Sequence, residues 1–266
     1  MFENKIVAVT GGTDGIGRAL VEAFLQQGAK VATCSRTAEK LDQLQTSLSN
    51  NNLITIVADV SKEEDCKNFI VKTREHYGKI DILVNNAGIS MRAEFKETDL
   101  STLKKVMDIN FWGTVYCTKY ALNSIIENKG TIVGVSSIAG YRGLPGRSGY
   151  SASKFALTGW LEALRTELIE DGVNVMWVCP GFTQSNIRKV ALNAHSKPQG
   201  ESPLNENNLM TAEECAQHIL KAIKKRKRTL VLTFKGKQTV FMNKFFPGLT
   251  DKLTRNFFYK NRKLIK

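Results

Sequence analysis

The amino-acid sequence predicts a single α/β domain built on a doubly wound parallel sheet, followed by a basic helical tail. Short runs rich in β-branched residues recur and are typical of strands buried on both faces. The runs fall at 6–9, 31–34, 53–57, 82–84, 131–135 and 173–178. The stretches between them, such as 18–27 and 38–48, place apolar residues three or four apart, as amphipathic helices do. Because crossovers between parallel strands are right-handed, a doubly wound sheet is the expected topology.

After the sixth run, the sequence predicts a loop, a helix and one more strand before the tail. Residues 192–208 are polar and contain prolines and a glycine, which indicates a long loop of the kind that often covers a binding site. A helix is expected over 211–227 and a strand over 229–233. We therefore predict one domain over residues 1–233 and a basic, aromatic-rich helical extension over 234–266.

The positive charge of the chain is concentrated near its end. The 266 residues contain 38 Lys and Arg against 25 Asp and Glu, a formal net charge of +13. Residues 221–266 hold 15 of these bases and a single acid, Asp251, so the rest of the chain is close to neutral. A nucleic-acid binder is expected to carry its charge on a working face of the domain. We therefore expect no nucleic-acid partner, and the basic run at 224–228 is placed at a helix C-terminus, where cations are favourable.

Cysteine usage and hydropathy indicate a cytoplasmic protein. The five cysteines are odd in number and widely spaced, which predicts neither a disulfide framework nor a metal site. No run of 18 apolar residues occurs, and the first residues lead straight into a strand pattern without a signal peptide. Peripheral contact with a membrane through the tail is left open.

A glycine-rich segment follows the first predicted strand. Residues 10–17 read Thr-Gly-Gly-Thr-Asp-Gly-Ile-Gly, at a point where a strand turns into a helix. Such a turn lets backbone amides approach a pyrophosphate at a helix N-terminus. The spacing Gly11-x-x-x-Gly15-x-Gly17 departs from the strict dinucleotide fingerprint, because Leu20 stands where a third glycine would fall. The segment alone is equally compatible with a tight turn.

The end of the second predicted strand bears on the choice of cofactor. In sheets of this type, an acid about 20 residues after the glycines binds the ribose 2′-hydroxyl of NAD. Here the strand ends in Ser35-Arg36, with no acid. A guanidinium can form charge-assisted hydrogen bonds to a 2′-phosphate, which predicts NADP(H) over NAD(H). Two observations stand against this: Asp14 lies near the expected adenosine ribose, and Arg36 could be a solvated residue at a helix start.

Three further motifs follow different predicted strands: Asn85-Asn86-Ala87-Gly88, Ser136-Ser137 and Tyr150-x-x-x-Lys154. Positions four apart share one face of a helix, so Lys154 lies near Tyr150. A nearby ammonium favours the phenolate and lowers the phenol pKa from its ordinary value near ~10. A tyrosine tuned in this way can serve a carbonyl/hydroxyl couple as acid and base. Each motif alone is common in ordinary turns and helices; their order along the chain indicates an active site.

This combination resembles the main oxidoreductase branch of the short-chain dehydrogenase/reductase family over about residues 5–233. The resemblance rests on Thr10-Gly11-x-x-x-Gly15-x-Gly17, Asp59, Asn85-Asn86-Ala87-Gly88, Asn110, Ser137, Tyr150-x-x-x-Lys154 and Pro180-Gly181. It implies a Rossmann-type fold and a homodimer or homotetramer. It also implies that NADP(H) is bound by Gly11, Thr13, Asp14, Gly15, Ile16, Gly17, Ser35, Arg36, Asp59, Val60, Asn86, Ala87, Gly88, Tyr150, Lys154, Pro180, Gly181 and Thr183.

The resemblance further implies the roles of four catalytic residues. Tyr150 would act as the acid and base, and Ser137, 13 positions before it, would hydrogen-bond the reacting oxygen. Lys154 would hold the nicotinamide ribose while lowering the pKa of Tyr150, and Asn110 would position a water molecule for a proton relay. The implied reaction is reversible hydride transfer between NADP(H) and a ketone or a secondary alcohol.

The substrate and a second class of function stay open. Substrate contacts are expected from residues 89–92, 138–147 and 182–208. A dinucleotide-binding fold can also serve as a redox sensor or scaffold without turnover, because fold does not imply function. A sensor of that kind needs none of Ser137, Tyr150 and Lys154, so their presence favours an enzyme.

The tail carries an apolar stripe. Five apolar residues recur at every fourth position: Phe241, Phe245, Leu249, Leu253 and Phe257. Pro247 is expected to divide them between two helices. An apolar face opposite lysines describes an interfacial helix on an anionic membrane. If the tail does contact lipid, the family resemblance implies a lipophilic substrate, because some members with basic, aromatic C-termini act on steroids or on long-chain keto lipids such as 3-ketosphinganine. The simpler interpretation is that the stripe packs on the domain or on a partner subunit.

Overall fold

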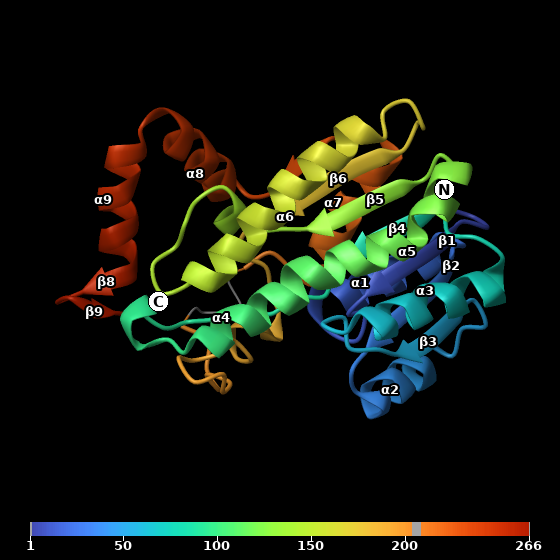
Figure 1. The fold of residues 1–266 in the computed structure, drawn as a ribbon, viewed down its shortest axis with the longest axis horizontal. Helices are drawn as coiled ribbons and strands as arrows, with labels where there is room; N and C mark the ends of the chain where they lie inside the picture. The colour runs from blue at the N-terminus through green and yellow to red at the C-terminus, as the bar shows by residue number, and fades with distance from the viewer. Residues whose placement is uncertain (1, 204–208, 266) are drawn as a thin grey trace.

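The chain forms a seven-stranded parallel sheet (Figure 1) in a computed structural model that describes residues 2–203 and 209–265. The strand order is β3-β2-β1-β4-β5-β6-β7, and every neighbouring pair runs parallel. The strands are β1 (Ile6–Thr10), β2 (Lys30–Ser35), β3 (Leu53–Val57), β4 (Ile82–Asn85), β5 (Thr131–Val135), β6 (Asn174–Cys179) and β7 (Thr229–Val231).

Helices cover both faces of the sheet. One face packs against α1 (Gly15–Gln26), α2 (Ala38–Leu48) and α7 (Ala212–Lys224). The other packs against α3 (Glu63–Tyr77), α5 (Gly113–Glu127) and α6 (Ser148–Glu167), with α4 (Leu100–Met107) beside α6. In β1, Val7 and Val9 enter the first core and Ala8 enters the second. Because both faces are buried, the strands are apolar throughout instead of alternating.

The observed strand order confirms the predicted doubly wound sheet. The structure differs from the prediction in the segments that connect the strands. Helix α7 ends at Lys224, three residues before the expected boundary, because Arg226 adopts a left-handed conformation with φ of 46°. A π-helical turn, η2 (Asp108–Trp112), interrupts the helix between α4 and α5. The remaining short elements are η1 (Phe95–Glu97), η3 (Ile138–Gly140), η4 (Asn186–Arg188), β8 (Tyr259–Lys260) and β9 (Lys263–Leu264).

Part of the loop predicted over 192–208 can be placed. Residues 204–208 lie outside the described residues. The described part contains isolated bridges, in which Leu192 pairs with Met91 and with Pro198. The loop therefore lies against the segment that follows β4.

The winding of the sheet reverses between β1 and β4. In an open α/β sheet, ligands bind beyond the carboxyl ends of the strands at such a point. The glycine-rich segment follows β1, and the Asn85-Asn86-Ala87-Gly88 motif begins at the last residue of β4. The topology thus brings the two motifs together, although they are more than 60 residues apart in the chain.

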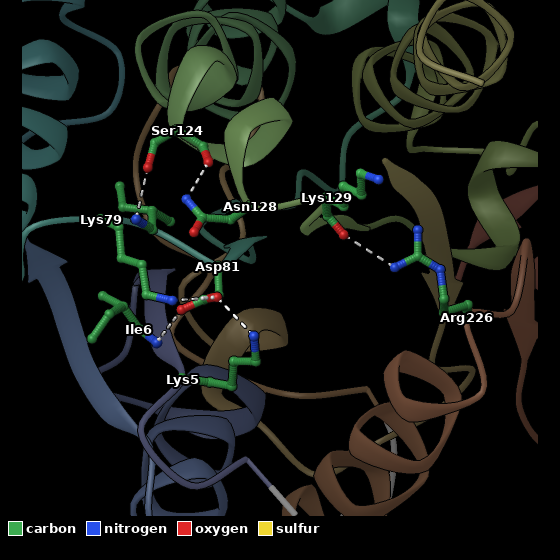
Figure 2. Close-up of polar contacts among 9 residues, drawn as sticks. Lys5, Ile6, Lys79, Asp81, Ser124, Asn128, Lys129 and Arg226 are labelled. Carbon is green, nitrogen blue, oxygen red and sulfur yellow. Dashed lines mark hydrogen bonds and ion pairs between the residues drawn. The ribbon is translucent and has the colours of Figure 1, made fainter. Parts of the chain in front are cut away.

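A polar network occupies the opposite end of the sheet (Figure 2). The buried carboxylate of Asp81 accepts hydrogen bonds from the backbone amide of Ile6 at 2.9 Å and from the ammonium groups of Lys5 at 2.9 Å and Lys79 at 3.0 Å. Burial alone would raise the pKa of Asp81, but these hydrogen bonds hold it below its usual range. Since its partners come from β1 and from the chain leading into β4, Asp81 ties the amino ends of the two central strands together.

The tail forms two helices joined by a sharp bend. Helices α8 (Phe234–Phe245) and α9 (Pro247–Phe258) are separated at Pro247, as the sequence predicts. Figure 1 shows the pair at the edge of the molecule farthest from α2 and β3. Thr233 caps the N-terminus of α8, and its side chain accepts a hydrogen bond from the amide of Gly236 at 3.1 Å.

All five cysteines are buried free thiols. Burial raises the pKa of the Cys34 thiol to about 12, which makes the reactive thiolate scarce. Within the described ranges, no three His, Cys, Asp or Glu side chains are grouped so that they could hold a metal ion. Over residues 2–203 and 209–265, no helix has the length and apolar character needed to cross a bilayer.

Candidate active site

A cavity of about 790 Å³ lies beyond the carboxyl ends of the central strands. Every site residue predicted from the sequence lines it, except Asn110. The topology thus places the glycine-rich segment, the Asn85-Asn86-Ala87-Gly88 motif, Ser137, Tyr150 and Lys154 around one space. A cavity of this volume is within the range of ligand and cofactor sites.

The turn between β1 and α1 is shaped for glycine. Gly11 and Gly15 have φ angles of +70° and +50°, which residues with a Cβ rarely adopt. A Cβ on Gly17 would lie 2.1 Å from the carbonyl oxygen of Gly11 and 2.4 Å from Nδ2 of Asn86. The three glycines therefore present only backbone atoms to the cavity at the N-terminus of α1, where amide groups and the helix dipole favour an anion.

Asn86 holds this turn in place. Its Nδ2 donates to the carbonyl oxygens of Thr10 at 3.0 Å and Gly11 at 3.1 Å. The hydroxyl of Thr10 in turn accepts from the backbone amides of Asn86 and Ala87, each at 3.0 Å. Since its amide donors are used on the glycine turn, Asn86 shapes the phosphate end of the cavity by fixing that turn.

The end of the cavity near β2 carries two cations and two acids. The exposed Arg36 lies there with Lys40 of α2, a lysine that the sequence analysis did not single out. Asp14 accepts a hydrogen bond from Nδ2 of Asn186 at 2.9 Å, which links the glycine turn to η4. Asp59 accepts from the backbone and the hydroxyl of Ser61, at 3.1 and 2.8 Å. Both acids thus have protein partners, while Arg36 and Lys40 supply positive charge beside them.

Ser137 and Tyr150 are joined by a hydrogen bond at the other end of the cavity. Ser137 is the N-cap of η3, and its Oγ accepts from the amide of Ala139 at 3.1 Å, which fixes the direction of the side chain. The neighbouring Ser136 also lines the cavity, but it is buried, with only 4% of its surface exposed. The arrangement agrees with the choice of Ser137 over Ser136 as the residue facing a reacting oxygen.

The pKa of Tyr150 differs from the sequence-based expectation. Burial raises it above the ordinary value, while the hydrogen bond from Ser137 and the positive charge of Arg147 act in the opposite direction without cancelling the effect of burial. The expected lowering by Lys154 is not seen, because its ammonium lies 5.8 Å from the centroid of the Tyr150 ring and donates elsewhere. Without a bound cofactor, Tyr150 is therefore a protonated phenol at neutral pH and can donate its proton.

Lys154 is buried beneath Tyr150, with 4% of its surface exposed. Its Nζ donates to the carbonyl oxygen of Val135, the last residue of β5, at 2.8 Å. Burial lowers the pKa of Lys154 to about 8, since few groups around it stabilise the charged form. The amine is thereby held between the end of β5 and Tyr150.

The buried amine predicts a specific pH dependence of stability. The pKa of Lys154 is about 8 in the folded chain against an ordinary 10.5, so the unfolded chain binds more protons between these values. The free energy of unfolding of the natural protein should therefore rise relative to that of Lys154→Met between pH 7 and pH 10, by up to about 3 kcal/mol at ~1.4 kcal/mol per pH unit. Urea denaturation at several pH values measures this difference, and parallel pH profiles of the two proteins would contradict it.

Asn110 lies behind the cavity wall, in the π-helical turn η2. It is fully buried, and its Oδ1 accepts from the backbone amide of Ile89 at 2.8 Å. Its Nδ2 donates to the carbonyl oxygen of Ile89 and to the hydroxyl of Ser153, each at 2.9 Å. Asn110 therefore links the segment after β4 to α6, next to Tyr150 and Lys154. π-helical turns are frequent at functional sites.

The substrate side of the cavity is largely apolar. Its side chains come from the segments after β4, β5 and β6 and also from the tail: Ile89, Ile138, Leu144, Phe182, Ile187, Val190, Met242, Leu253, Phe257 and Phe258. The contribution of the tail could not be read from the sequence, because its helices lie about 100 residues from Ser137 and carry no catalytic motif.

Arg147 and Arg188 line the cavity beside Tyr150. Both fall within the ranges 138–147 and 182–208 from which substrate contacts are expected, but the sequence analysis assigned no role to either residue. Their positive charges act to lower the pKa of Tyr150. Arg147 lies three residues before Tyr150, and its guanidinium lies 5.2 Å from the ring centroid of Phe258 in the tail. Burial, followed by the charges of Arg92 and Arg188, lowers the pKa of Arg147 to about 10. The i, i+3 spacing to Tyr150 was the signal that could have identified Arg147.

These features fit a nicotinamide dinucleotide. The glycine turn keeps its shape because Gly17 has no Cβ to overlap Gly11 and Asn86, and it lies next to a helix N-terminus suited to phosphate. Arg36 and Lys40 border one end of the cavity, and Lys154, Ser137 and Tyr150 border the other. The residues present could thus hold an anionic, elongated cofactor with its reactive end beside Tyr150.

Comparisons with known proteins give a consistent result. The family model described as short chain dehydrogenase matches residues 5–195. Mouse dehydrogenase/reductase SDR family member 7B is 33% identical over 270 residues, which cover 98% of this chain and 84% of that protein. The 11-beta-hydroxysteroid dehydrogenase A of Arachis hypogaea is 35% identical over 257 residues, covering 93% of this chain and 73% of that protein.

A solved structure shares the fold over nearly the whole chain. A short-chain dehydrogenase from Streptomyces avermitilis superposes with a TM-score of 0.82 at 27% sequence identity, covering 97% of this chain and 100% of that one. The similarity therefore extends beyond the matched residues 5–195 and includes part of the tail region.

Proposed function

Because the chain belongs to the short-chain dehydrogenase family, we propose that it is an NADP(H)-dependent oxidoreductase that interconverts a ketone and a secondary alcohol. The observation that carries this proposal is the grouping of Ser137, Tyr150 and Lys154 at one end of the cavity whose other end is the glycine turn of β1 and α1. Family membership supports an oxidoreductase acting on alcohols or ketones.

The proposed chemistry at Tyr150 is proton transfer to or from the reacting oxygen. The hydroxyls of Ser137 and Tyr150, which hydrogen-bond each other, would both donate to a carbonyl oxygen placed beside them. NADP(H), when bound, supplies or accepts the hydride. A phenol whose pKa is raised by burial stays protonated at neutral pH, so Tyr150 is prepared to act as the acid of ketone reduction.

Lys154 and Asn110 would prepare the site for this step. Lys154, anchored on the carbonyl of Val135, has further amine donors that can hydrogen-bond a ribose hydroxyl. Asn110 would act as a positioning residue, because its hydrogen bonds to Ile89 and Ser153 fix the two segments that flank the reacting groups. This role differs from the water-positioning role that the family resemblance implies.

The preference for NADP(H) is assigned to Arg36, with Lys40 beside it. Replacing Arg36 with aspartate is expected to raise KM for NADPH about 10- to 100-fold, because a hydrogen bond to a charged group contributes about 1.5–3 kcal/mol. KM for NADH should change much less, since NADH lacks the 2′-phosphate. Initial rates measured with each cofactor test this, with Arg74→Asp on the exposed surface of α3 as the control. Equal or NADH-favouring KM values in the natural protein would refute the preference.

The substrate proposed for the apolar end of the cavity is a lipophilic ketone, either a steroid or a long-chain 3-keto lipid. The lining of aliphatic and aromatic side chains supports it, and the Arachis hypogaea relative is named as a hydroxysteroid dehydrogenase. NADPH oxidation should be measured against small ketones, steroids and long-chain 3-keto lipids. Turnover confined to small polar ketones would contradict the substrate class, and tight NADPH binding without turnover of any ketone would contradict the enzyme.

A further inference from the structure

The α8–α9 hairpin presents an apolar surface that is not packed on the domain. Six of its side chains are between 41% and 56% exposed: Phe241, Phe245, Phe246, Leu249, Leu253 and Phe257. The ring centroid of Phe241 lies 4.9 Å from that of Phe245 and 6.4 Å from that of Phe246, so these three form one cluster at the bend. The described part of the chain therefore covers only about half of the surface of these side chains, and the interpretation that the stripe packs on the domain or on a partner subunit stays a prediction. Large exposed apolar patches mark surfaces of interaction.

The hairpin also carries a large excess of positive charge, and Nζ of Lys244 lies 5.4 Å from the ring centroid of Phe245. Residues 234–265 contain eight Lys and Arg and a single acid, Asp251. All eight basic residues are exposed, whereas Asp251 forms an ion pair with Arg142 of the domain. The outer surface of the hairpin thus combines aromatic and leucine side chains with unopposed positive charge.

The inner side of the hairpin is fixed to the domain by a few specific contacts. Arg142 donates to Oδ1 of Asn243 at 3.0 Å, and Nδ2 of Asn243 donates to the carbonyl oxygen of Tyr141 at 2.9 Å. Phe258 is buried against the guanidinium of Arg147. These contacts set the orientation of the hairpin, so its apolar cluster is held facing outward.

The exposed surface is continuous with the substrate end of the cavity. Leu253 and Phe257 belong to the exposed stripe and also line the cavity that contains Tyr150. The same two side chains therefore border both the outer apolar surface and the space proposed for the substrate. An apolar molecule could pass from one to the other without crossing water.

We propose that the α8–α9 hairpin docks on a bilayer containing anionic phospholipid, and that substrate enters the cavity from the bilayer past Leu253 and Phe257. The entry route rests on the proposed function; the docking does not. Charge complementarity favours a bilayer over a second copy of this chain, because two hairpins face to face would bring like charges together. Anionic headgroups attract Lys and Arg, while the interfacial region accepts aromatic side chains.

Vesicle co-sedimentation of the full chain tests the docking without cofactor or substrate. The natural protein should sediment with vesicles of phosphatidylcholine and phosphatidylserine and much less with phosphatidylcholine alone. The combined variant Phe241→Ser, Phe245→Ser and Leu249→Ser should lose at least about tenfold in partitioning. The matched control is Val57→Ser, Val71→Ser and Ile169→Ser, three exposed apolar residues of the domain, and it should bind like the natural protein.

A second variant separates charge from apolar contact. Lys244→Glu, Lys252→Glu and Arg255→Glu should abolish the preference for phosphatidylserine. None of the three apolar tail positions lines the cavity, so turnover of a water-soluble ketone should persist in Phe241→Ser, Phe245→Ser and Leu249→Ser. Vesicle binding without turnover of any ketone would support the docking while refuting the proposed function.

Two results would overturn the docking. One is equal partitioning of the tail variant and the domain control, which would make the binding nonspecific. The other is failure of the natural protein to bind anionic vesicles, combined with a change of oligomeric state in the tail variant by light scattering. That second result would identify the apolar surface as an interface between subunits.

Discussion

Replacing Tyr150 with phenylalanine is expected to reduce kcat for ketone reduction by about 10²–10⁴-fold, the range attributed to general acid–base catalysis. The substitution removes only the hydroxyl that would donate the proton and that hydrogen-bonds Ser137. The glycine turn and Lys154 stay in place, so the Kd for NADPH should change little. Stopped-flow or steady-state kinetics measure the first effect, and fluorescence titration measures the second.

Tyr120→Phe is the matched control for Tyr150→Phe, because it removes a tyrosine hydroxyl away from the cavity. Tyr120→Phe removes a hydroxyl that hydrogen-bonds Glu63 at 2.7 Å on the outer surface of α5 and α3. It should leave kcat unchanged. Undiminished turnover in Tyr150→Phe would refute the proposed proton transfer, whereas a parallel loss of kcat and of NADPH binding would indicate a structural role for the hydroxyl.

Gly17→Ala is expected to have the largest effect on the cofactor end of the cavity. The added Cβ would lie 2.1 Å from the carbonyl oxygen of Gly11, so the glycine turn must move. Overpacking of this kind costs about 1–3 kcal/mol of stability. A displacement of about 1 Å in a positioning element can cost about 10²-fold in activity, and we expect a comparable rise in the Kd for NADPH.

Gly159→Ala in α6 provides the control. Nothing lies within 4 Å of a Cβ at Gly159, and alanine is favoured over glycine inside a helix by about 0.5–1 kcal/mol. Thermal denaturation should therefore show a loss of stability for Gly17→Ala and a small gain for Gly159→Ala. NADPH binding to Gly17→Ala with natural affinity would show that the turn is not part of the cofactor site.

Many strands and helices could be predicted because neighbouring residues in the sequence are enough to specify them. β-branched runs buried on both faces predict β1, β4 and β5, and Pro247 predicts the bend between α8 and α9 because it cannot continue a helix. The π-helical turn at Asn110 could not be predicted, since no residue type in Asp108–Trp112 requires it. The hydrogen bonds of Asn110 to Ile89 and Ser153 form only when β4 and α6 are adjacent.

The directions of the pKa shifts of Tyr150 and Lys154 could be found only from the assembled structure. Helical spacing places Lys154 one turn from Tyr150, and from spacing alone the ammonium should lower the pKa of the phenol. The fold buries both groups, and burial disfavours whichever form carries charge. Burial therefore raises the pKa of Tyr150 and lowers that of Lys154 to about 8. The amine donates to Val135 and not to the phenol, so the lowering of the phenol pKa that the spacing predicts is not seen.

Residue types and their order were enough to predict the strand and helix order, the glycine turn, the Ser137–Tyr150–Lys154 motif and the basic tail. Each depends on residue type and on spacings within one or two elements. The assembled fold was needed to show that the tail borders the cavity and leaves about half of the surface of its apolar stripe exposed. That outcome depends on a few distant contacts, such as Arg142 with Asn243 and Arg147 with Phe258, whose partners lie about 100 residues apart in the chain.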